Sequence, residues 1–296
     1  MGPQDLRTIH HRGGLVMSAL GGKAAGGEGI NPTGSVVGIV ILLVSIAATY
    51  ALGFSIVPLI GIIIGGALIG FGVHFVPVGG APAAMGQAPG IATGVAMLAA
   101  GAGLAGLFGG AWAYEATGDF AVAVAGGAVG GGLMMAITCL MVNATYVFAM
   151  GIPAASGKIA KDPITGDTFP EYKSQGTEGH GLPFISFFGG VVGGFIAGLG
   201  GTLIYIELLD VYHTGLPAIM QANPEAIEPL AVSLAGIFAI GFFLVNAVLA
   251  AYNITGTIEG PHDPKFKRVP RAIIGCAVAS AFCGLISMLI VLNTGM

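Results

Sequence analysis

Charged side chains are scarce in this sequence, because Asp, Glu, Lys and Arg together make up only 8% of its 296 residues. A soluble domain of ordinary composition contains about a quarter charged residues. This shortage excludes an ordinary soluble globular domain, and the 55% share of hydrophobic residues agrees with that exclusion. The chain is therefore predicted to be an integral membrane protein.

Cysteine is also scarce, and its three copies form no ligand or disulfide pattern. Cys139, Cys276 and Cys283 lie in apolar segments without CxxC or Cys/His spacing, so we interpret them as small packing residues. Ser-His-Asp and Walker arrangements are missing too. No catalytic residue and no metal site are therefore predicted for this chain alone. Residues 1–34 lack the short apolar core of a signal peptide and are predicted to be a cytoplasmic tail.

Glycine, in contrast, is abundant, with 53 copies among 296 residues, whereas a typical protein contains about 7% glycine. The glycines lie inside apolar runs, and those between positions 189 and 201 have small-xxx-small spacing. Small residues let transmembrane helices approach closely where lipid supplies no hydrophobic drive. The pattern predicts a tightly packed, glycine-rich helix bundle.

Seven apolar segments are long enough to cross a bilayer, which requires about 20 residues. They cover residues 35–57, 58–76, 90–112, 120–150, 184–206, 229–253 and 272–293. A tight turn at Pro58 separates the first two. The predicted fold is an all-α bundle of about seven transmembrane helices within residues 35–296.

The basic residues predict the orientation of this bundle. With the N-terminus in the cytoplasm, seven spans place the segments 1–34, 77–89, 151–183 and 254–271 on the cytoplasmic side. All ten Lys and Arg residues then lie inside, whereas the outer loops contain acidic residues and no basic ones. We therefore expect a multi-pass protein of the cell membrane with a cytoplasmic N-terminus.

Two asparagines lie within predicted spans, where polar side chains are costly and therefore mark functional candidates. Asn143 and Asn246 occupy matching positions in a weak repeat, AITCLMVNA at 136–144 and AIGFFLVNA at 239–247. Because a carboxamide oxygen can help to coordinate a hard cation such as sodium, both are candidates for an ion path. An interhelical hydrogen bond that holds the bundle together is the alternative.

Two carboxylates follow the fifth predicted span. Glu207 and Asp210 come after 23 apolar residues, which as a helix cover about 34 Å. Both are therefore expected at the outer interface. They are either plain solvated residues or an exit-side funnel for cations at the end of the ion path.

The predicted cytoplasmic loops contain two unusual motifs, GTEGHGLP at 176–183 and GTIEGPHDPKFKR at 256–268. Each places a Gly-Thr, a Glu-Gly and a histidine close to a helix end, and a further histidine ends the second span. Buried caps and tight turns are one interpretation of these motifs. A small cytoplasmic cavity is the other, and it would be lined by His74, Thr177, Glu178, His180, Glu259 and His262.

Five segments resemble the D subunit of tetrahydromethanopterin S-methyltransferase, a membrane-bound methyl-transfer complex of methanogenic archaea. They are GVHFVPVGGAPAAM (72–85), GIATG…MLAAGAGLAGL (90–107), DPITG (162–166), GTEGHG (176–181) and TIEGPHDPKFKR (257–268). The resemblance covers roughly residues 58–296, with its motifs in order. Residues 1–57 then form an extension, with an additional first helix before six family-like spans.

The resemblance implies that the complex transfers a methyl group from methyl-tetrahydromethanopterin to coenzyme M through a cobamide, and couples the transfer to sodium export. The cobamide is carried by a partner, the A subunit, so this chain alone is expected to bind no cofactor. Sodium ion and coenzyme M are ligands of the complex. Other implied partners are the C and E membrane subunits and membrane lipids, but no nucleic acid. The chain would be one component of a translocase and not catalytic alone.

Two alternatives stay open on the sequence alone. A stand-alone secondary transporter or channel would explain the helices, the repeat and the asparagines equally well. A purely structural scaffold subunit is the other, because no acidic residue is predicted at mid-membrane.

Overall fold

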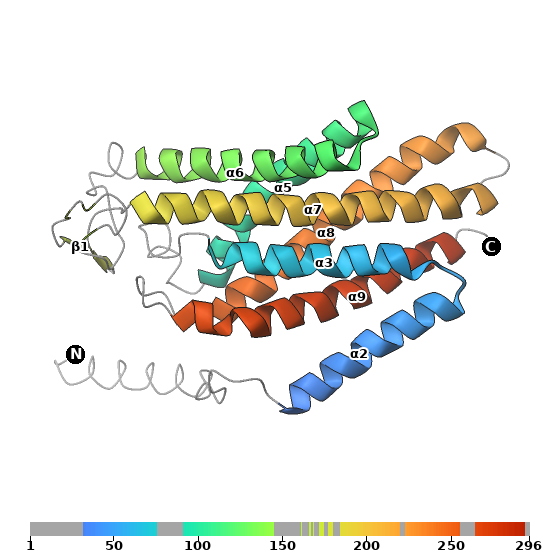
Figure 1. Cartoon of the computed structure of the whole chain (residues 1–296), viewed down its shortest axis with the longest axis horizontal. Coiled ribbons are helices and arrows are strands. Elements are labelled where there is room, and N and C mark those ends of the chain that lie inside the picture. The colour runs from blue at the N-terminus through green and yellow to red at the C-terminus, as the bar shows by residue number, and fades with distance from the viewer. Residues whose placement is uncertain are drawn as a thin grey trace, which may run out of the picture.

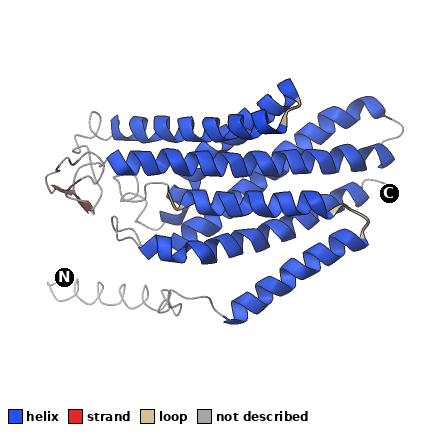
Figure 2. Ribbon diagram, in the orientation of Figure 1, coloured by secondary structure: helices blue, strands red, loops and turns tan. Residues whose placement is uncertain are grey.

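The computed structural model of the chain describes residues 32–75, 91–144, 161, 166, 168, 172–174, 177–179, 184–219, 223–254 and 264–293. Long helices that run roughly along one axis form its architecture (Figure 1). The described residues also contain a small antiparallel hairpin of strands β1 (Tyr172–Ser174) and β2 (Thr177–Gly179) (Figure 2). The predicted helical architecture is confirmed, with this hairpin as an addition.

Seven long helices lie within the described ranges. They are α2 (Pro32–Ala51), α3 (Ile56–Val73), α5 (Ile91–Thr117), α6 (Phe120–Ala144), α7 (Phe184–Ile219), α8 (Ile227–Ile254) and α9 (Val269–Asn293), and the short 3-10 helices η2 (Pro224–Ala226) and η3 (Pro264–Arg268) precede α8 and α9. Among the described residues, six of the long helices are long and apolar enough to cross a membrane, and α5 is not one of the six. The count of seven spans and the cytoplasmic N-terminus therefore stay predictions.

The boundary between α2 and α3 differs from the predicted turn at Pro58. The chain turns earlier, at residues 52–55, where Gly53 has a φ of +82° that favours glycine. The Ser55 side chain then caps α3, because its hydroxyl oxygen accepts a hydrogen bond of 3.3 Å from the Val57 amide. Pro58 falls in the first turn of α3, where its missing N–H is not needed.

Helix α7 is longer than the predicted fifth span, because it continues beyond residue 206 to Ile219 and includes Pro217. Glu207 and Asp210 end the apolar run in the sequence, but a carboxylate does not terminate a helix. The helix also begins beyond the end of α3: a Cβ on Gly189 would meet the Phe75 carbonyl oxygen at 2.8 Å. The first residues of α7 therefore lie beyond the end of α3 rather than alongside it.

The helices α6, α7, α3 and α9 lie side by side in Figure 1, and α5 and α8 pass behind them. Helix α7 is the central helix of the bundle. Of its apolar stretch, 61% is buried inside the bundle, whereas for α2 the buried share is 11%. We call the end near β1 and β2 the hairpin end. The opposite end contains the turn between α2 and α3, the turn between α5 and α6, and η2.

Glycines let the central helices pack backbone to backbone. A Cβ added to Gly131 of α6 would overlap the carbonyl oxygen of Gly194 of α7, and one on Gly198 would overlap the carbonyl oxygen of Gly127. On the other side of α7, a Cβ on Gly200 would approach the Gly65 carbonyl oxygen of α3 to 2.5 Å. The predicted glycine-mediated packing is the packing that these helices show.

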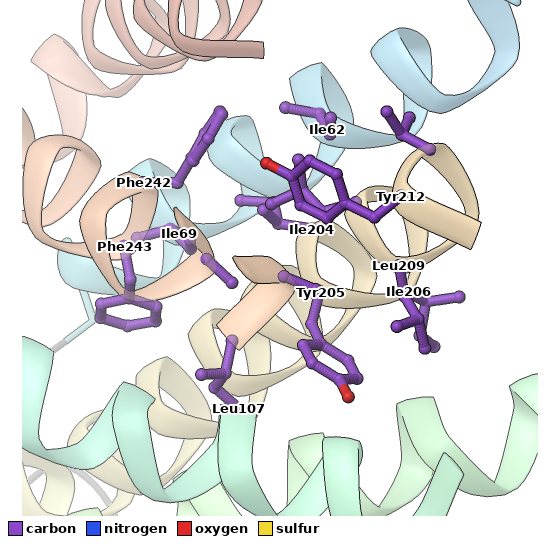
Figure 3. Packing of buried hydrophobic residues seen from close by; sticks show 14 of the residues in the cluster. Ile62, Ile69, Leu107, Ile204, Tyr205, Ile206, Leu209, Tyr212, Phe242 and Phe243 are labelled. Carbon is purple, nitrogen blue, oxygen red and sulfur yellow. The ribbon is translucent and has the colours of Figure 1, made fainter. Parts of the chain in front are cut away.

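Between the helices, large apolar side chains pack together into a buried hydrophobic cluster (Figure 3). They come from α3, α5, α7 and α8, and include the fully buried residues Ile69, Leu107, Ile204, Tyr212 and Phe243. Dense packing of this kind fixes the position of each helix against α7. The polar groups described next are therefore held at defined positions between helices.

Candidate functional site

A cluster of hydrogen bonds joins three helix ends at the hairpin end, and its centre is Asn253 near the end of α8. The Nδ2 of Asn253 donates to the carbonyl oxygen of Arg268 at 3.0 Å and lies 3.1 Å from Nε2 of His74. Its Oδ1 accepts from Nε of Arg271 at 2.8 Å, and its backbone oxygen accepts from Arg268 Nη1 at 3.1 Å. One residue thus connects α3, α8 and the start of α9.

His74 is completely buried at the C-terminal cap of α3. Its Nδ1 lies 2.7 Å from the carbonyl oxygen of Gly70. Because a carbonyl oxygen only accepts, Nδ1 carries the proton and Nε2 is left to accept from Asn253. This tautomer is assigned from the partners, and it satisfies both ring nitrogens with a neutral imidazole.

Replacing Asn253 by leucine is expected to lower the free energy of unfolding by about 2 kcal/mol, because three side-chain hydrogen bonds between helix ends are lost at about 0.6 kcal/mol each. Thermal unfolding of the intact chain in detergent measures this loss. Ser233→Ala is the control, since the Ser233 hydroxyl makes an exposed bond of 2.7 Å to Pro229 within α8. An equal effect of the two substitutions would contradict the linking role of Asn253.

A second polar group lies deeper in the bundle, between α8 and α9. Asn246 is fully buried, and its Nδ2 donates to the Phe242 carbonyl oxygen and to the Ser280 hydroxyl oxygen, both at 2.9 Å. Within the described residues, Oδ1 of Asn246 has no hydrogen-bond partner. The asparagine therefore forms the interhelical bond that the sequence left open, and it still offers one acceptor oxygen at the same place.

These two groups lie along one groove of α3, because positions 66, 70 and 74 are spaced by one helical turn. A Cβ on Gly66 would overlap the Ser280 hydroxyl, and one on Gly70 would meet Cys276 Sγ at 2.6 Å. Gly66 lies eight residues before His74, which is about 12 Å along the helix axis. The groove between α3, α8 and α9 thus contains a line of polar groups from the hairpin end to about the middle of α3.

Polar contacts at the opposite end join other pairs of helices. The Tyr205 hydroxyl of α7 donates to Oε1 of Glu115 at the end of α5, at 2.9 Å. Nε2 of His213 lies 2.8 Å from Oε2 of Glu228 at the start of α8. These contacts place carboxylates, and no Lys or Arg, at the opposite end of the described bundle.

Glu207 and Asp210 differ in their surroundings although both belong to α7. Asp210 is exposed, whereas Glu207 is partly buried beside α3, where a Cβ on Gly61 would overlap its carboxylate. Gly61 lies five residues after the start of α3 at Ile56. Glu207 therefore lies alongside α3, five residues from its start.

The structure places the remaining predicted site residues only in part. Thr177 and Glu178 belong to β2, and Glu178 pairs with Lys173 of β1 in the register of the hairpin. The side chains of Thr177 and Glu178, and that of Asn143 on α6, are outside the described part of the chain. His180, Glu259 and His262 lie outside the described residues altogether.

Among the predicted residues whose side chains the structure describes, His74 and Asn246 share a groove, whereas Glu207 and Asp210 lie elsewhere on α7. Asn253 and Ser280 complete that groove but were not predicted from the sequence. Asn253 could have been predicted from the sequence. It follows Asn246 by seven residues, and this spacing of two helical turns places both asparagines on one face of a helix. Ser280 could not have been predicted, since serine is common in apolar helices and its partner is 34 residues away.

Comparison with known proteins gives a consistent result. The family model for the D subunit of tetrahydromethanopterin S-methyltransferase matches residues 55–280. The D subunit of this enzyme from Methanosarcina mazei is 48% identical over 242 residues, which are 81% of this chain and 96% of the relative. The D subunit from Methanothermobacter marburgensis is 51% identical over 228 residues, 77% of this chain and 93% of the relative.

A more distant relative agrees with these two. The D subunit from Methanocaldococcus jannaschii is 44% identical over 242 residues, which are 80% of this chain and 98% of the relative. The family match begins at residue 55, so it includes α3 and the polar groove but not α2. On these matches, the chain belongs to the family formed by the D subunits of tetrahydromethanopterin S-methyltransferase.

Proposed function

We propose that this chain is a membrane subunit of a complex that transfers a methyl group from methyl-tetrahydromethanopterin to coenzyme M through a cobamide on another subunit, and that couples this transfer to sodium export. Family membership carries the first part of the proposal. The observation that supports a role in transport is the line of polar groups between α3, α8 and α9. In lipid, buried polar side chains of this kind mark functional sites by default.

The hairpin end is proposed to face the cytoplasm. Among the described residues, every Lys and Arg belongs to the bridge at Lys161, to β1, to η3 or to the start of α9, namely Lys161, Lys173, Lys265, Lys267, Arg268 and Arg271. Cytoplasmic loops of membrane proteins carry such an excess of basic residues. This orientation places the N-terminus of α2 in the cytoplasm and the chain in the cell membrane.

A cavity at the hairpin end is proposed to accept coenzyme M beside the docked cobamide of a partner. His74 contributes a buried imidazole, and Arg268 and Arg271 contribute positive charge next to it. Guanidinium groups suit an anionic sulfonate, which they can bind through paired N–H groups. Thr177, Glu178, His180, Glu259 and His262 are proposed to complete this cavity from the loops.

The ion path is proposed to pass Asn246, whose Oδ1 offers an acceptor oxygen within the groove. Asn143 stays a candidate from the repeat. Glu207 and Asp210 stay candidates for the outer end of the path, and the exposed Asp210 is the better placed of the two to attract cations.

A scaffold role is the second candidate function, and the Asn246 hydrogen bonds favour it. Both protons of the Asn246 amide are used within the bundle, on Phe242 and Ser280. A residue that only holds α8 against α9 would make the same two bonds. The ion path would then lie in sister chains.

Purification of the tagged chain from methanogen membranes in mild detergent tests complex membership. Mass spectrometry identifies the partners, and an absorption spectrum reveals a corrinoid. We expect several membrane proteins, including the C and E subunits, together with the cobamide-carrying A subunit. Recovery of a lone chain or homo-oligomer without corrinoid would instead make an independent transporter the leading function.

Replacing Glu178 by glutamine is expected to slow methyl transfer to coenzyme M about fivefold in the assembled complex, because the cavity loses one hydrogen-bonding charge. Steady-state methyl transfer and sodium uptake into vesicles are the two measurements. Glu225→Gln is the matched control, since Glu225 is exposed at the opposite end. If Glu178→Gln leaves both rates at the wild-type level, the assignment of the hairpin to the cavity is wrong.

A further inference from the structure

One helical face of the molecule carries two carboxylates, Glu207 and Asp210. Helices α3 and α7 lie side by side in the front layer of Figure 1, while α5 and α8 pass behind them. The side chains exposed or half-exposed along these two helices form what we call the α3–α7 face. It consists of Val57, Ile60 and Ile64 of α3 and of Leu203, Glu207, Asp210 and Thr214 of α7.

Glu207 of this face lies within the apolar layer. Helix α3 contains 18 residues and is therefore about 27 Å long, nearly the thickness of the hydrocarbon core. We take the two ends of α3 as the boundaries of the hydrocarbon core. Glu207 lies beside Gly61, five residues from the start of α3, and is therefore about 8 Å inside the boundary at that end. The carboxylate is thus separated from the outer surface by more than one helical turn.

Gly61 leaves space for this side chain, because a Cβ there would overlap the Glu207 carboxylate in its present rotamer. Within the described residues, Glu207 has no hydrogen bond and no ion pair, and the charged neighbour that acts on it is the like-charged Asp210. Tyr205, the nearest hydroxyl of α7 in sequence, donates to Glu115 instead. The chain therefore makes room for the carboxylate and supplies no donor.

Lipid tails do not supply a donor either, and an acidic side chain in the hydrocarbon layer is costly. A protein partner with a donor at the same depth removes this cost. A second copy of this chain fits poorly through this face, because none of the named face residues is a lysine, an arginine or an amide that could pair with Glu207. The apolar residues Val57, Ile60 and Ile64, spaced by three and four, form a stripe against which a helix can pack.

We propose that the α3–α7 face is a subunit interface, covered by a transmembrane helix of another membrane subunit that presents a lysine, arginine or amide donor to Glu207. The proposal rests on the proposed membership in a multisubunit complex, and it does not depend on which chain conducts the ions. The charge of Glu207 selects the partner, and the apolar stripe of α3 supplies the contact area.

Site-specific photo-crosslinking in the whole complex tests the contact directly. Benzoylphenylalanine at position 64 is expected to give a covalent adduct with another membrane subunit, and the same probe at position 60 a weaker one. The matched control is position 237 on α8, which is also exposed but belongs to a different face. The proposal is overturned if positions 60 and 64 give no adduct with a different subunit, or if they give an adduct with a second copy of this chain.

The charge is tested by Glu207→Leu in the tagged chain. The amount of the crosslinked partner that co-purifies is expected to fall about tenfold, while Asp210→Leu, with the same loss of charge one turn away at an exposed position, changes it less than twofold. Glu207→Gln, which keeps the size and an acceptor oxygen, is expected to fall between them. Equal retention in Glu207→Leu and Asp210→Leu would overturn the role of Glu207.

The proposed function and the proposed interface predict different outcomes when one of them is wrong. If the wild-type chain purifies without other subunits, the proposed function fails and the interface fails with it. If corrinoid and partner subunits co-purify but position 64 reaches none of them, the proposed function stands and the interface alone is rejected.

Discussion

Substitution of Gly131 by alanine is expected to destabilise the bundle by about 3 kcal/mol, the upper part of the usual cost of overpacking. A Cβ at this position of α6 would overlap the backbone of α7, chiefly the carbonyl group of Gly194. A side chain in the way could rotate, but a backbone carbonyl cannot move without shifting the whole helix. The midpoint of thermal unfolding of the intact chain in detergent measures the effect.

Gly241→Ala in α8 is the matched control. Its added Cβ meets nothing within 4 Å, so alanine is expected to be neutral or to stabilise the helix by up to about 1 kcal/mol through its higher helix propensity. The two substitutions add the same single carbon atom. If they shift the midpoint equally, close glycine contact between α6 and α7 does not hold this bundle together.

If the complex exports sodium as proposed, Asn246→Leu is expected to reduce this transport about 30-fold, which corresponds to about 2 kcal/mol. Leucine has a similar size but removes the acceptor oxygen that the groove offers to a cation. Stability should fall by only about 1 kcal/mol, because hydrogen bonds between membrane helices contribute about 0.6 kcal/mol each. Sodium-22 uptake into vesicles that contain the complex measures transport, with methyl transfer measured in parallel.

Thr49→Val is the control for this experiment. Thr49 is also a fully buried polar residue, and its hydroxyl donates to the Ser45 carbonyl oxygen at 2.8 Å within α2. It lies outside the family match, and valine preserves its shape, so transport should stay within twofold of the wild type. If Asn246→Leu leaves transport unchanged too, the asparagine is a structural link and the scaffold function is favoured.

Part of the candidate site was predictable because it depends on local chemistry. His74 at a helix end and Asn246 in an apolar run are unusual wherever the helices lie, and both belong to the polar groove. Asn253 was overlooked although it follows Asn246 by two helical turns. It lies near the end of α8, where an asparagine is not unusual in a sequence. Its role becomes visible only through its contacts with α3 and α9.

The depth of Glu207 was not predictable in the same way. The count along one helix assumes that the helix starts at the membrane boundary, whereas α7 begins beyond the end of α3, with Gly189 beside Phe75. That offset is set by contacts such as Gly200 against Gly65, which lie far apart in the sequence. Glu207 therefore lies beside Gly61, five residues after the start of α3, and its expected place at the outer interface stays a prediction.

By itself, the sequence determined the class of protein and the position of its helices, since apolar length and composition depend only on neighbouring residues. It also indicated the family, through motifs spread over most of the chain. Only the tertiary structure decided which helices meet, how far each is displaced along its neighbour, and therefore which polar side chains share a groove. Those features depend on backbone approach between glycines of different helices, and no local pattern records which pairs will meet.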